Sequence, residues 1–199
     1  MNLRSIAIGL FVLALIGAAR WYPHRSIAHE PGVLIDSLPQ QSEPASTAPI
    51  QRGDYQLTPL ADFELEARVL SRADYAIDAG SDLSPTDLAL GWRRMSDTAV
   101  IEQLDIEQSV RFYSYRWQHA PPIPPDEIIR SSANMHLIPA DDTVKDDLDT
   151  VRQGSLIHLR GHLVYAQRSD GFHWRSSLTR EDTGAGACEL VLVEAVERL

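Results

Sequence analysis

The sequence is poor in two residue types that often carry protein chemistry. Cys188 is its only cysteine, so an intramolecular disulfide and a thiolate metal cage are both excluded. Lys145 is its only lysine, although arginine is abundant, which removes P-loop and Schiff-base lysines from consideration. What remains for chemistry is carboxylates, histidines, arginines and one thiol.

Positive charge is also scarce. The chain has 18 lysines and arginines against 28 carboxylates, a formal net charge of −10. A surface of that sign repels phosphate backbones, so we expect no nucleic-acid partner. The apolar content of 44% is that of a globular chain, because a disordered chain lacks the residues for a core.

Only one hydrophobic run is long enough to suggest a membrane segment. It covers 5–19, and Arg20, Trp21 and Tyr22 follow it. The run is short for a spanning helix and fits the core of a signal peptide, but the aromatic residues after it are typical of a membrane interface. Residues 1–22 are therefore interpreted as a signal anchor, with a cleaved signal peptide as the alternative. The expected location is the inner membrane, single-pass, with the globular domain in the periplasm.

Residues 23–59 are expected to form a proline-rich extended tether. This stretch contains six of the twelve prolines, and its polar segment 40–49 has no means of burying a core. A short apolar island at 31–35 is expected to dock on the domain or on a partner. Residues 60–199 are then a single mixed α/β globular domain.

Hydrophobic patterning divides this domain into strands and short helices. Alternation predicts a strand at 63–69, and β-branched and aromatic residues predict another at 106–117. Capping signals predict short helices at 84–91 and 97–104, and one helical turn is expected at 126–131, after the proline run 121–125. Apolar residues at i, i+4 and i+7, with acidic residues in the first turn, predict a helix at 142–151. An extended segment at 135–138 precedes a meander with strands at 155–167, 172–178 and 189–197, and Gly161 predicts a bulge or sharp bend in the first of these. The expected fold class is α+β: a small, strongly coiled antiparallel sheet or partial barrel, OB-like or SH3-like, with short helices, behind an N-terminal hydrophobic helix.

Two polar segments are candidates for a ligand-binding face. The loop 176–189 is rich in glycine, and glycines let backbone N–H groups converge on an anion. The segment 131–136 supplies hydroxyl, amide and imidazole groups. A plain turn between two strands is the preferred explanation of the loop, because turn chemistry alone accounts for these residue types. The candidate ligand-binding residues are Ser132, Asn134, His136, Arg175, Ser177, Arg180, Asp182, Gly184 and Gly186.

The same segments contain the parts of a cysteine-based catalytic set. Cys188 would be the nucleophile, His136 its base, and Asn134 the group that orients the base. A buried, inert thiol is the usual outcome for a cysteine among apolar neighbours. The set is therefore the alternative hypothesis and not the first.

No metal ion or other cofactor is expected. His158 and His162 have the i, i+4 spacing of helical metal ligands, but on a strand their rings would be about 13 Å apart. The acidic stretch 141–149 has none of the pattern of an EF-hand loop. A solvated helix face accounts for it.

Four longer segments resemble a family of small membrane-anchored proteobacterial envelope proteins that have no established activity. They are HEPGVLIDSLPQQ at 29–41, SPTDLALGW with MSD at 84–97, SSANMHLIPA at 131–140, and WRSSLTREDTGAGACE at 174–189. The resemblance implies a shared architecture and a Gram-negative origin, and it brings no catalytic residue. Where the family has Gly-Pro after Gly-Trp, this chain has Arg93 and Arg94.

The first functional hypothesis is a non-enzymatic, membrane-tethered periplasmic binding or assembly module. It would recognise a protein or a small anionic ligand through the face of segments 131–136 and 175–188, with an envelope protein as partner and the membrane contacted through residues 5–22. The alternative is an envelope hydrolase or transferase that uses Cys188 and His136.

Overall fold

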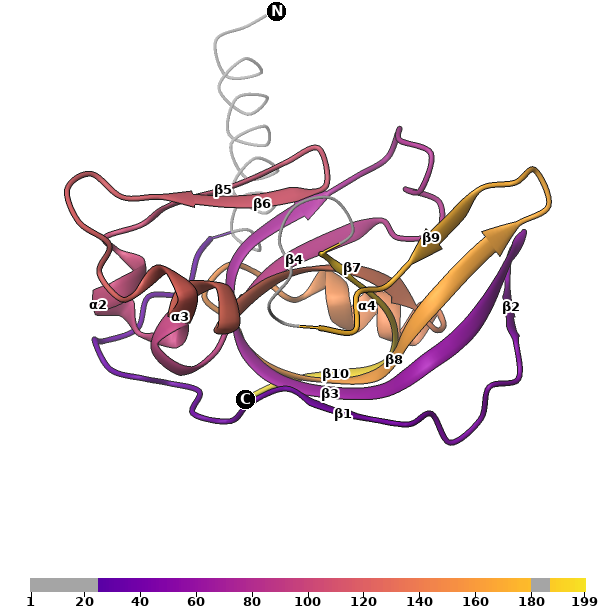
Figure 1. Ribbon diagram of the computed structural model, residues 1–199, viewed down its shortest axis with the longest axis horizontal. Coiled ribbons are helices and arrows are strands. Elements are labelled where there is room, and N and C mark those ends of the chain that lie inside the picture. The colour runs from indigo at the N-terminus through magenta and orange to yellow at the C-terminus, as the bar shows by residue number, and fades with distance from the viewer. Residues whose placement is uncertain (1–24, 180–186) are drawn as a thin grey trace, which may run out of the picture.

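The computed structural model describes residues 25–179 and 187–199. This part of the chain is an α+β structure that consists mostly of strands, with a large mixed sheet and few short helices (Figure 1). Its strands are β1 (Gln40–Ser42), β2 (Ile50–Arg52), β3 (Tyr55–Asp74), β4 (Thr86–Gly91), β5 (Asp105–Ser109), β6 (Phe112–Arg116), β7 (Ser132–Pro139), β8 (Leu156–Arg168), β9 (His173–Arg175) and β10 (Glu189–Arg198). Its helices are the 3₁₀ turn η2 (Arg93–Ser96), α2 (Thr98–Ile101), α3 (Pro125–Arg130) and α4 (Asp142–Asp149).

Five strands of the large sheet close into a circuit in the order β3-β4-β7-β10-β8, because β3 pairs with both β4 and β8. Every pairing in the circuit is antiparallel except the one between β7 and β10. Strand β3 spans 20 residues; its first part pairs with β8 and its last part with β4. Register shifts at Pro59/Ala61 and Val69/Ser71 mark the irregularities that bend it.

The core fills the inside of this circuit. Alternate residues of β3 point inward, including Phe63, Leu65 and Ala67, and meet Leu88 and Leu90 of β4. Helix α4, between β7 and β8, adds Val144 and Leu148 to the same cluster. Each fully buried Leu contributes roughly 1.5–3 kcal/mol, so the alternation detected in the sequence is also the main source of stability for this sheet.

Gly161 lies where the backbone of β10 leaves no room for a side chain on β8. A side chain there would overlap the backbone of Leu192, and the register between the two strands shifts beside it, between Val193 and Ala195. The irregularity predicted from this glycine is therefore present, and it lies on the partner strand.

The helix predicted at 84–91 is wrong. Residues Thr86–Gly91 form β4, which lies between β3 and β7 and is buried along its whole length. The sequence Ser84-Pro85-Thr86-Asp87 matches a helix start. The two leucines that follow, Leu88 and Leu90, are spaced as in a strand, and both point into the core. Sheet pairing on both edges outweighs the local capping preference.

The single strand predicted at 106–117 is also wrong, because it is two strands. Strands β5 and β6 form a separate two-stranded hairpin that turns at Val110 and Arg111. Both residues have positive φ, 51° and 69°. Two-residue hairpin turns of this kind normally carry Asn or Gly, so the turn has no sequence signal.

The other elements follow the predictions, with shifted ends. Helices α2, α3 and α4 are confirmed, and Asp97 caps α2 by accepting from the backbone N–H of Ala99. Strands β7, β8 and β10 are confirmed, and the strand predicted at 172–178 is present only as the short β9.

Residues 25–59, expected as a tether, are extended but lie against the domain. Strands β1 and β2 both pair with β3, which begins at Tyr55, before the predicted boundary at residue 60. The apolar island docks: Ile35 is buried, its N–H donates to the Ser96 hydroxyl, and its carbonyl accepts from Arg93 N–H. The expected anchor at 1–22 lies outside the described residues, and none of the described helices is long and apolar enough to cross a membrane.

Candidate functional site

A cluster of polar side chains lies on the outer face of β4 and β7. The two strands pair so that Asp87 is opposite His136 and Ala89 is opposite Asn134. Successive side chains of a strand point to opposite faces, and Leu88 and Met135 point into the core. The polar residues therefore project outward at the side of the circuit where β4 and β7 meet.

Asp87 and His136 form a buried pair at the centre of the cluster. Nδ1 of His136 lies 2.9 Å from Oδ2 of Asp87, and the two side chains are 3% and 0% exposed. The two atoms are within ion-pair distance but are not aligned for a hydrogen bond. The imidazole packs on the ring of Trp174, 4.5 Å between centroids. Trp174 belongs to β9 and brings the β8–β10 connection onto this face.

Arg111, at the tip of the β5–β6 hairpin, reaches into the cluster. Its Nη1 donates to Oδ1 of Asp87 at 2.7 Å and to the carbonyl of Ser84 at 2.9 Å. Its Nε and Nη2 donate to the two oxygens of Asp78 at 3.0 and 2.9 Å, a bidentate pair. The guanidinium also lies 3.9 Å from the ring centroid of Tyr75. All of its N–H-bearing nitrogens are therefore engaged.

These contacts shift two pKa values in the directions expected of an ion pair. The hydrogen bonds from Arg111 lower the pKa of Asp78, although burial opposes the shift. Burial alone would lower the pKa of Arg111, but Asp78 and Asp87 outweigh it and the net pKa is raised. Arg111 is thus a permanent positive charge between two carboxylates.

The turn that carries Arg111 is strained. Val110 and Arg111 both have left-handed φ values, and a β-branched residue such as Val110 rarely adopts them. Such conformations cost of order 1–3 kcal/mol each and persist where surrounding contacts impose them. Val110 is 77% exposed, so little packing compensates for its strain. The contacts of Arg111, including the one from its backbone N–H to the Tyr75 hydroxyl, hold the turn in place.

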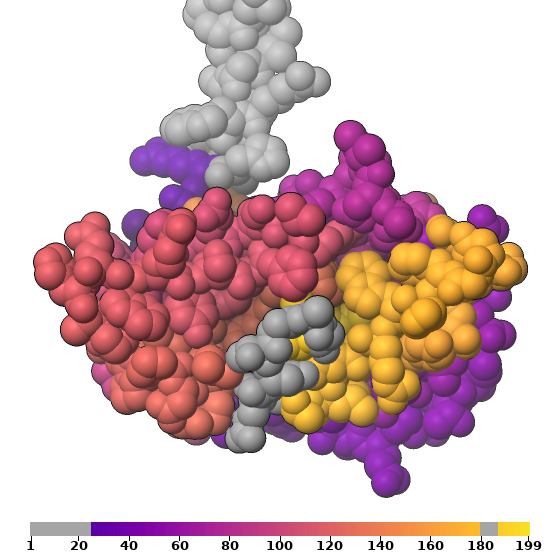
Figure 2. Space-filling view, turned by 45° about the horizontal axis from the view of Figure 1, so that its top comes forward, coloured from indigo at the N-terminus to yellow at the C-terminus, as the bar shows by residue number. Residues whose placement is uncertain are grey.

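The two segments singled out from the sequence meet on this face. Strands β7 and β10 pair in parallel, with Leu190 opposite His136. The amide nitrogen of Asn134 lies 3.9 Å from Sγ of Cys188, and the N–H of Ser177 donates to the carbonyl of Cys188. Figure 2 shows the hairpin region and the β8–β9 region bordering each other on one side of the molecule.

The arrangement differs from the one that the cysteine hypothesis requires. Among the described residues, the polar partner of His136 is Asp87. Asn134 accepts from Nε2 of Gln108, donates to the carbonyl of Arg111 and contacts Cys188. Its amide therefore lies against the thiol and the hairpin instead of orienting the imidazole.

The predicted ligand-binding residues divide into three groups. Ser132, Asn134 and His136 alternate along β7 and share its outer face, and Ser177 is buried beside Cys188. Arg175 is exposed and stacks over Tyr165 in the next strand, on the side of β9 opposite Trp174. Arg180, Asp182, Gly184 and Gly186 lie outside the described residues.

Three residues central to the cluster were not predicted as site residues. The sequence places Asp87 at a helix start, Arg111 within one continuous strand, and Trp174 within a predicted strand and a segment of the family resemblance. One signal marks Asp87: it is a carboxylate within a segment, Thr86–Gly91, that is otherwise largely apolar and is buried along its whole length. Buried carboxylates are rare unless they are paired. Nothing local distinguishes Arg111.

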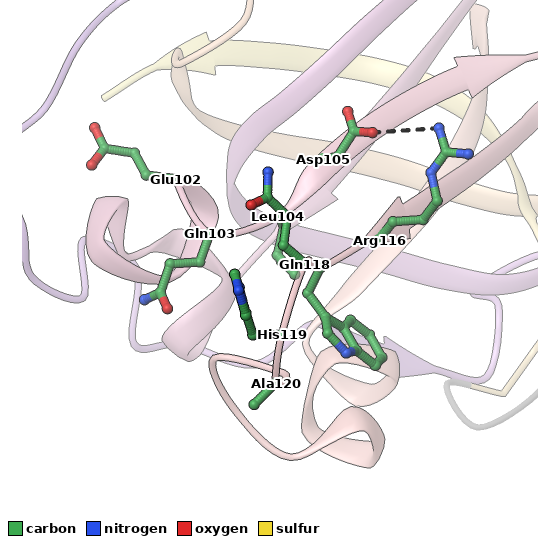
Figure 3. Close-up of a pocket in the computed structure, with 9 residues that line it drawn as sticks. Glu102, Gln103, Leu104, Asp105, Arg116, Gln118, His119 and Ala120 are labelled. Atoms are coloured by element: carbon green, nitrogen blue, oxygen red, sulfur yellow. Dashed lines mark hydrogen bonds and ion pairs between the residues drawn. The ribbon is translucent and has the colours of Figure 1, made fainter.

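A second feature, an open hollow of about 650 Å³, lies between α2 and the outgoing end of β6 (Figure 3). Its one drawn ion pair, Arg116 to Asp105 at 3.4 Å, joins side chains that are 69% and 72% exposed. Side chains this exposed are not held in a fixed arrangement by burial, so the hollow is a weaker candidate than the buried cluster.

The histidines of β8 do not converge. Nε2 of His158 contacts Glu64 at 2.6 Å, and Nδ1 of His162 contacts Asp62 at 2.9 Å, each carboxylate coming from β3. In the part of the chain that the structure describes, no group of three or more His, Cys, Asp or Glu residues is suited to hold a metal ion.

Comparison with known proteins adds no relative to this description. Neither a protein-family model, nor a curated protein, nor a solved structure matches the chain.

Proposed function

We propose that this protein is a non-enzymatic binding module, held at the periplasmic side of the inner membrane by residues 5–22, that recognises an envelope protein. Its recognition face consists of the outer surface of β4 and β7 with the described parts of the two connections that border it, residues 75–85, 169–179 and 187–188. We call this the β4–β7 face.

We infer that the circuit of five strands is an OB-type barrel, and this inference supports the proposal. OB-folds are five-stranded Greek-key barrels that bind ligands on their second and third strands and on the loops after the first and fourth strands. In the circuit described above, the second and third strands are β4 and β7, and the two loops are 75–85 and 169–188. The polar cluster contains residues from both strands and from both loops.

The observation that carries the proposal is this convergence. Asp78 from the first loop, Asp87 from β4 and Trp174 from the second loop surround one guanidinium, and His136 of β7 lies against both Asp87 and Trp174. Buried charges are costly to assemble, and a sheet needs none for its own stability. A cluster built from four separate segments on the binding side of the barrel is therefore better explained by recognition than by folding.

Between the two ligand classes expected from the sequence, the charges favour a protein. Asp78 and Asp87 flank a single arginine, and the chain as a whole has a net charge of −10. A small anion would meet both carboxylates when it approached. A protein offers hydrogen-bond donors, positive groups and apolar side chains together, and Ile77, Val110 and Phe112 are exposed near the cluster.

Site-specific crosslinking in intact cells tests the proposal. A photoreactive amino acid at Ile77 or at Phe112 stands next in sequence to a residue of the cluster. The comparison position is Glu43, directly after β1, and Figure 1 shows β1 and the β5–β6 hairpin on opposite sides of the molecule. We expect discrete crosslinked envelope proteins from the first two positions and not from Glu43. Equal products from all three positions, or none from any, would contradict the proposal.

A further inference from the structure

The surroundings of Arg111 are specific for a guanidinium group and not merely for positive charge. Asp78 meets the fork of Arg111 with both carboxylate oxygens, while Asp87 and the Ser84 carbonyl take the opposite edge. Tyr75 covers the planar face at 3.9 Å, and Trp174 lies at 5.6 Å. An ammonium group has neither the fork nor the plane that this arrangement matches. We refer to these five residues as the guanidinium site.

The guanidinium site is filled under strain. Arg111 enters it only because Val110 and Arg111 adopt left-handed backbone conformations, and Val110 gains little packing in return. The strain belongs to the hairpin and not to the site. Another arginine, supplied on a relaxed backbone, would make the same contacts without that cost.

The guanidinium site also retains unused polar capacity. The Ser84 hydroxyl is fully buried and has no hydrogen-bond partner within the described residues. Oδ2 of Asp87 is also without a hydrogen bond within the described residues, and Nδ1 of His136, beside the site, lies 2.9 Å from it but out of alignment. Buried polar groups are normally satisfied, and exceptions in native structures often mark functional sites. Arg111 therefore fits the site without satisfying all of it.

We propose that the guanidinium site recognises an arginine side chain of the partner protein, and that Arg111 occupies it as an internal substitute until the partner displaces the β5–β6 hairpin. This inference rests on the proposed function and specifies its ligand chemistry. The acidic domain attracts a basic segment, and the exposed side chains of Ile77, Val110 and Phe112 offer contacts to apolar residues beside the incoming arginine.

Four forms of the full-length protein test the displacement. In Arg111→Ala the site is vacated, in Arg111→Lys the fork is lost but the charge stays, and in Val110→Asn the turn is relaxed because Asn tolerates left-handed φ. The probe is N-acetyl-arginine methylamide, with the lysine analogue as its control. We expect affinity to fall in the order Arg111→Ala, Arg111→Lys, wild type, Val110→Asn, with at least tenfold between the first and the third. In Arg111→Ala, arginine should bind at least tenfold more tightly than lysine.

A purely structural ion pair predicts a different pattern. In that case the small probe would fill the hole in Arg111→Ala, but wild type and Val110→Asn would not differ, either for the probe or for crosslinking from Phe112 in cells. That pattern, or equal binding of the lysine analogue, overturns the inference. If Arg111→Ala does not fold, the ranking of Arg111→Lys, wild type and Val110→Asn decides the question alone.

The outcomes separate this inference from the proposed function. If partners crosslink from Ile77 and Val110→Asn does not change their yield, the proposed binding function is supported and the recognition of a partner arginine is contradicted. Absence of partners from both positions would remove the binding module and the inference with it. Arg116→Ala, on the same hairpin but exposed, is the matched control and should leave affinity and crosslinking unchanged.

Discussion

Two faces of the large sheet use the same pair of side chains in opposite ways. On the β4–β7 face, Asp87 and His136 are almost completely buried, and Arg111 is added to them. On the β3–β8 face, the histidines of β8 meet carboxylates of β3 in pairs that remain partly in water, with side-chain exposures of 19–46%. The first face adds the cation of Arg111 and aromatic cover, whereas the second has solvent and, beside His162, one further exposed carboxylate, Glu194 at 3.3 Å.

The difference shows what burial demands. An exposed histidine–carboxylate pair contributes little and needs nothing else, because water solvates both groups. A buried carboxylate must be compensated completely, because an unpaired charge in the interior is penalised by several kcal/mol. Arg111 is the compensating charge on the β4–β7 face. The strained hairpin is the structure that delivers it, and no comparable device is present in the described part of the β3–β8 face.

The largest expected effect follows from removing that charge. Arg111→Met keeps the length of the side chain but leaves Asp87 buried with His136 alone, so we expect unfolding free energy to fall by about 3 kcal/mol. Urea denaturation of the full-length protein measures this loss. Arg116→Met, in the same hairpin and 69% exposed, should change stability by less than about 0.5 kcal/mol. Similar losses in the two variants would mean that Arg111 does not compensate for Asp87.

A pH-dependent loss of about 2 kcal/mol in unfolding free energy is expected from Tyr55, the first residue of β3. Burial, followed by the hydrogen bond to Asp82, raises the pKa of Tyr55 to about 12 from its ordinary value of 10.0. Between these two pH values the unfolded chain loses the phenolic proton and the folded chain keeps it. Stability therefore falls as pH rises from about 10 to 12.

Tyr55→Phe isolates this contribution, since it removes the titrating group and keeps the ring. Its stability at pH 10 should be the lower of the two proteins, because Arg168 and Asp82 lose a partner, and the difference should shrink as pH approaches 12. Denaturation series for both proteins across this range measure the slopes. Parallel curves would show that Tyr55 titrates alike in both states.

A gain of about 1 kcal/mol is expected from relaxing the hairpin turn. Asn adopts left-handed φ far more readily than a β-branched residue, so Val110→Asn should stabilise the protein if Arg111 keeps its contacts. The double variant Val110→Asn with Arg111→Met separates strain from charge. The gain should shrink there, because without the side-chain contacts of Arg111 the turn is no longer held in the strained conformation. A stability loss in the single variant would show that Val110 is not strained.

Prediction from the sequence succeeded where one segment determines its own structure. The alternation within β3 and the i, i+4, i+7 pattern of α4 each specify an element, since the side chains that pack together belong to one periodic run. The predictions for β4 and for the β5–β6 hairpin were wrong for the opposite reason. β4 is a strand because β3 and β7 pair with it, and the turn at Val110 is imposed by contacts of Arg111 with residues 24 and 33 positions away.

The site divides in the same way. Asn134, His136 and Ser177 were singled out because their own segments are unusual, and parallel pairing of β7 with β10 brings those segments together. Asp87 and Arg111 are recognisable as site residues only through the ion pair that they form with each other. Their pairing depends on a turn without a sequence signal, so no reading of either segment alone would have joined them.

The smallest expected effect lies on the β3–β8 face. His158→Gln and His162→Gln remove the exposed pairs with Glu64 and Asp62 but keep a side chain that can form hydrogen bonds, so each should change stability by no more than about 0.5 kcal/mol. His136→Gln is the matched variant on the other face, and it places an amide beside a fully buried carboxylate and Trp174. This substitution should lower the unfolding free energy several times more, because the buried carboxylate of Asp87 is not solvated by water. If urea denaturation gave equal losses for all three histidines, burial would not be what distinguishes the two faces, and Arg111 would lose its role as the charge that burial requires.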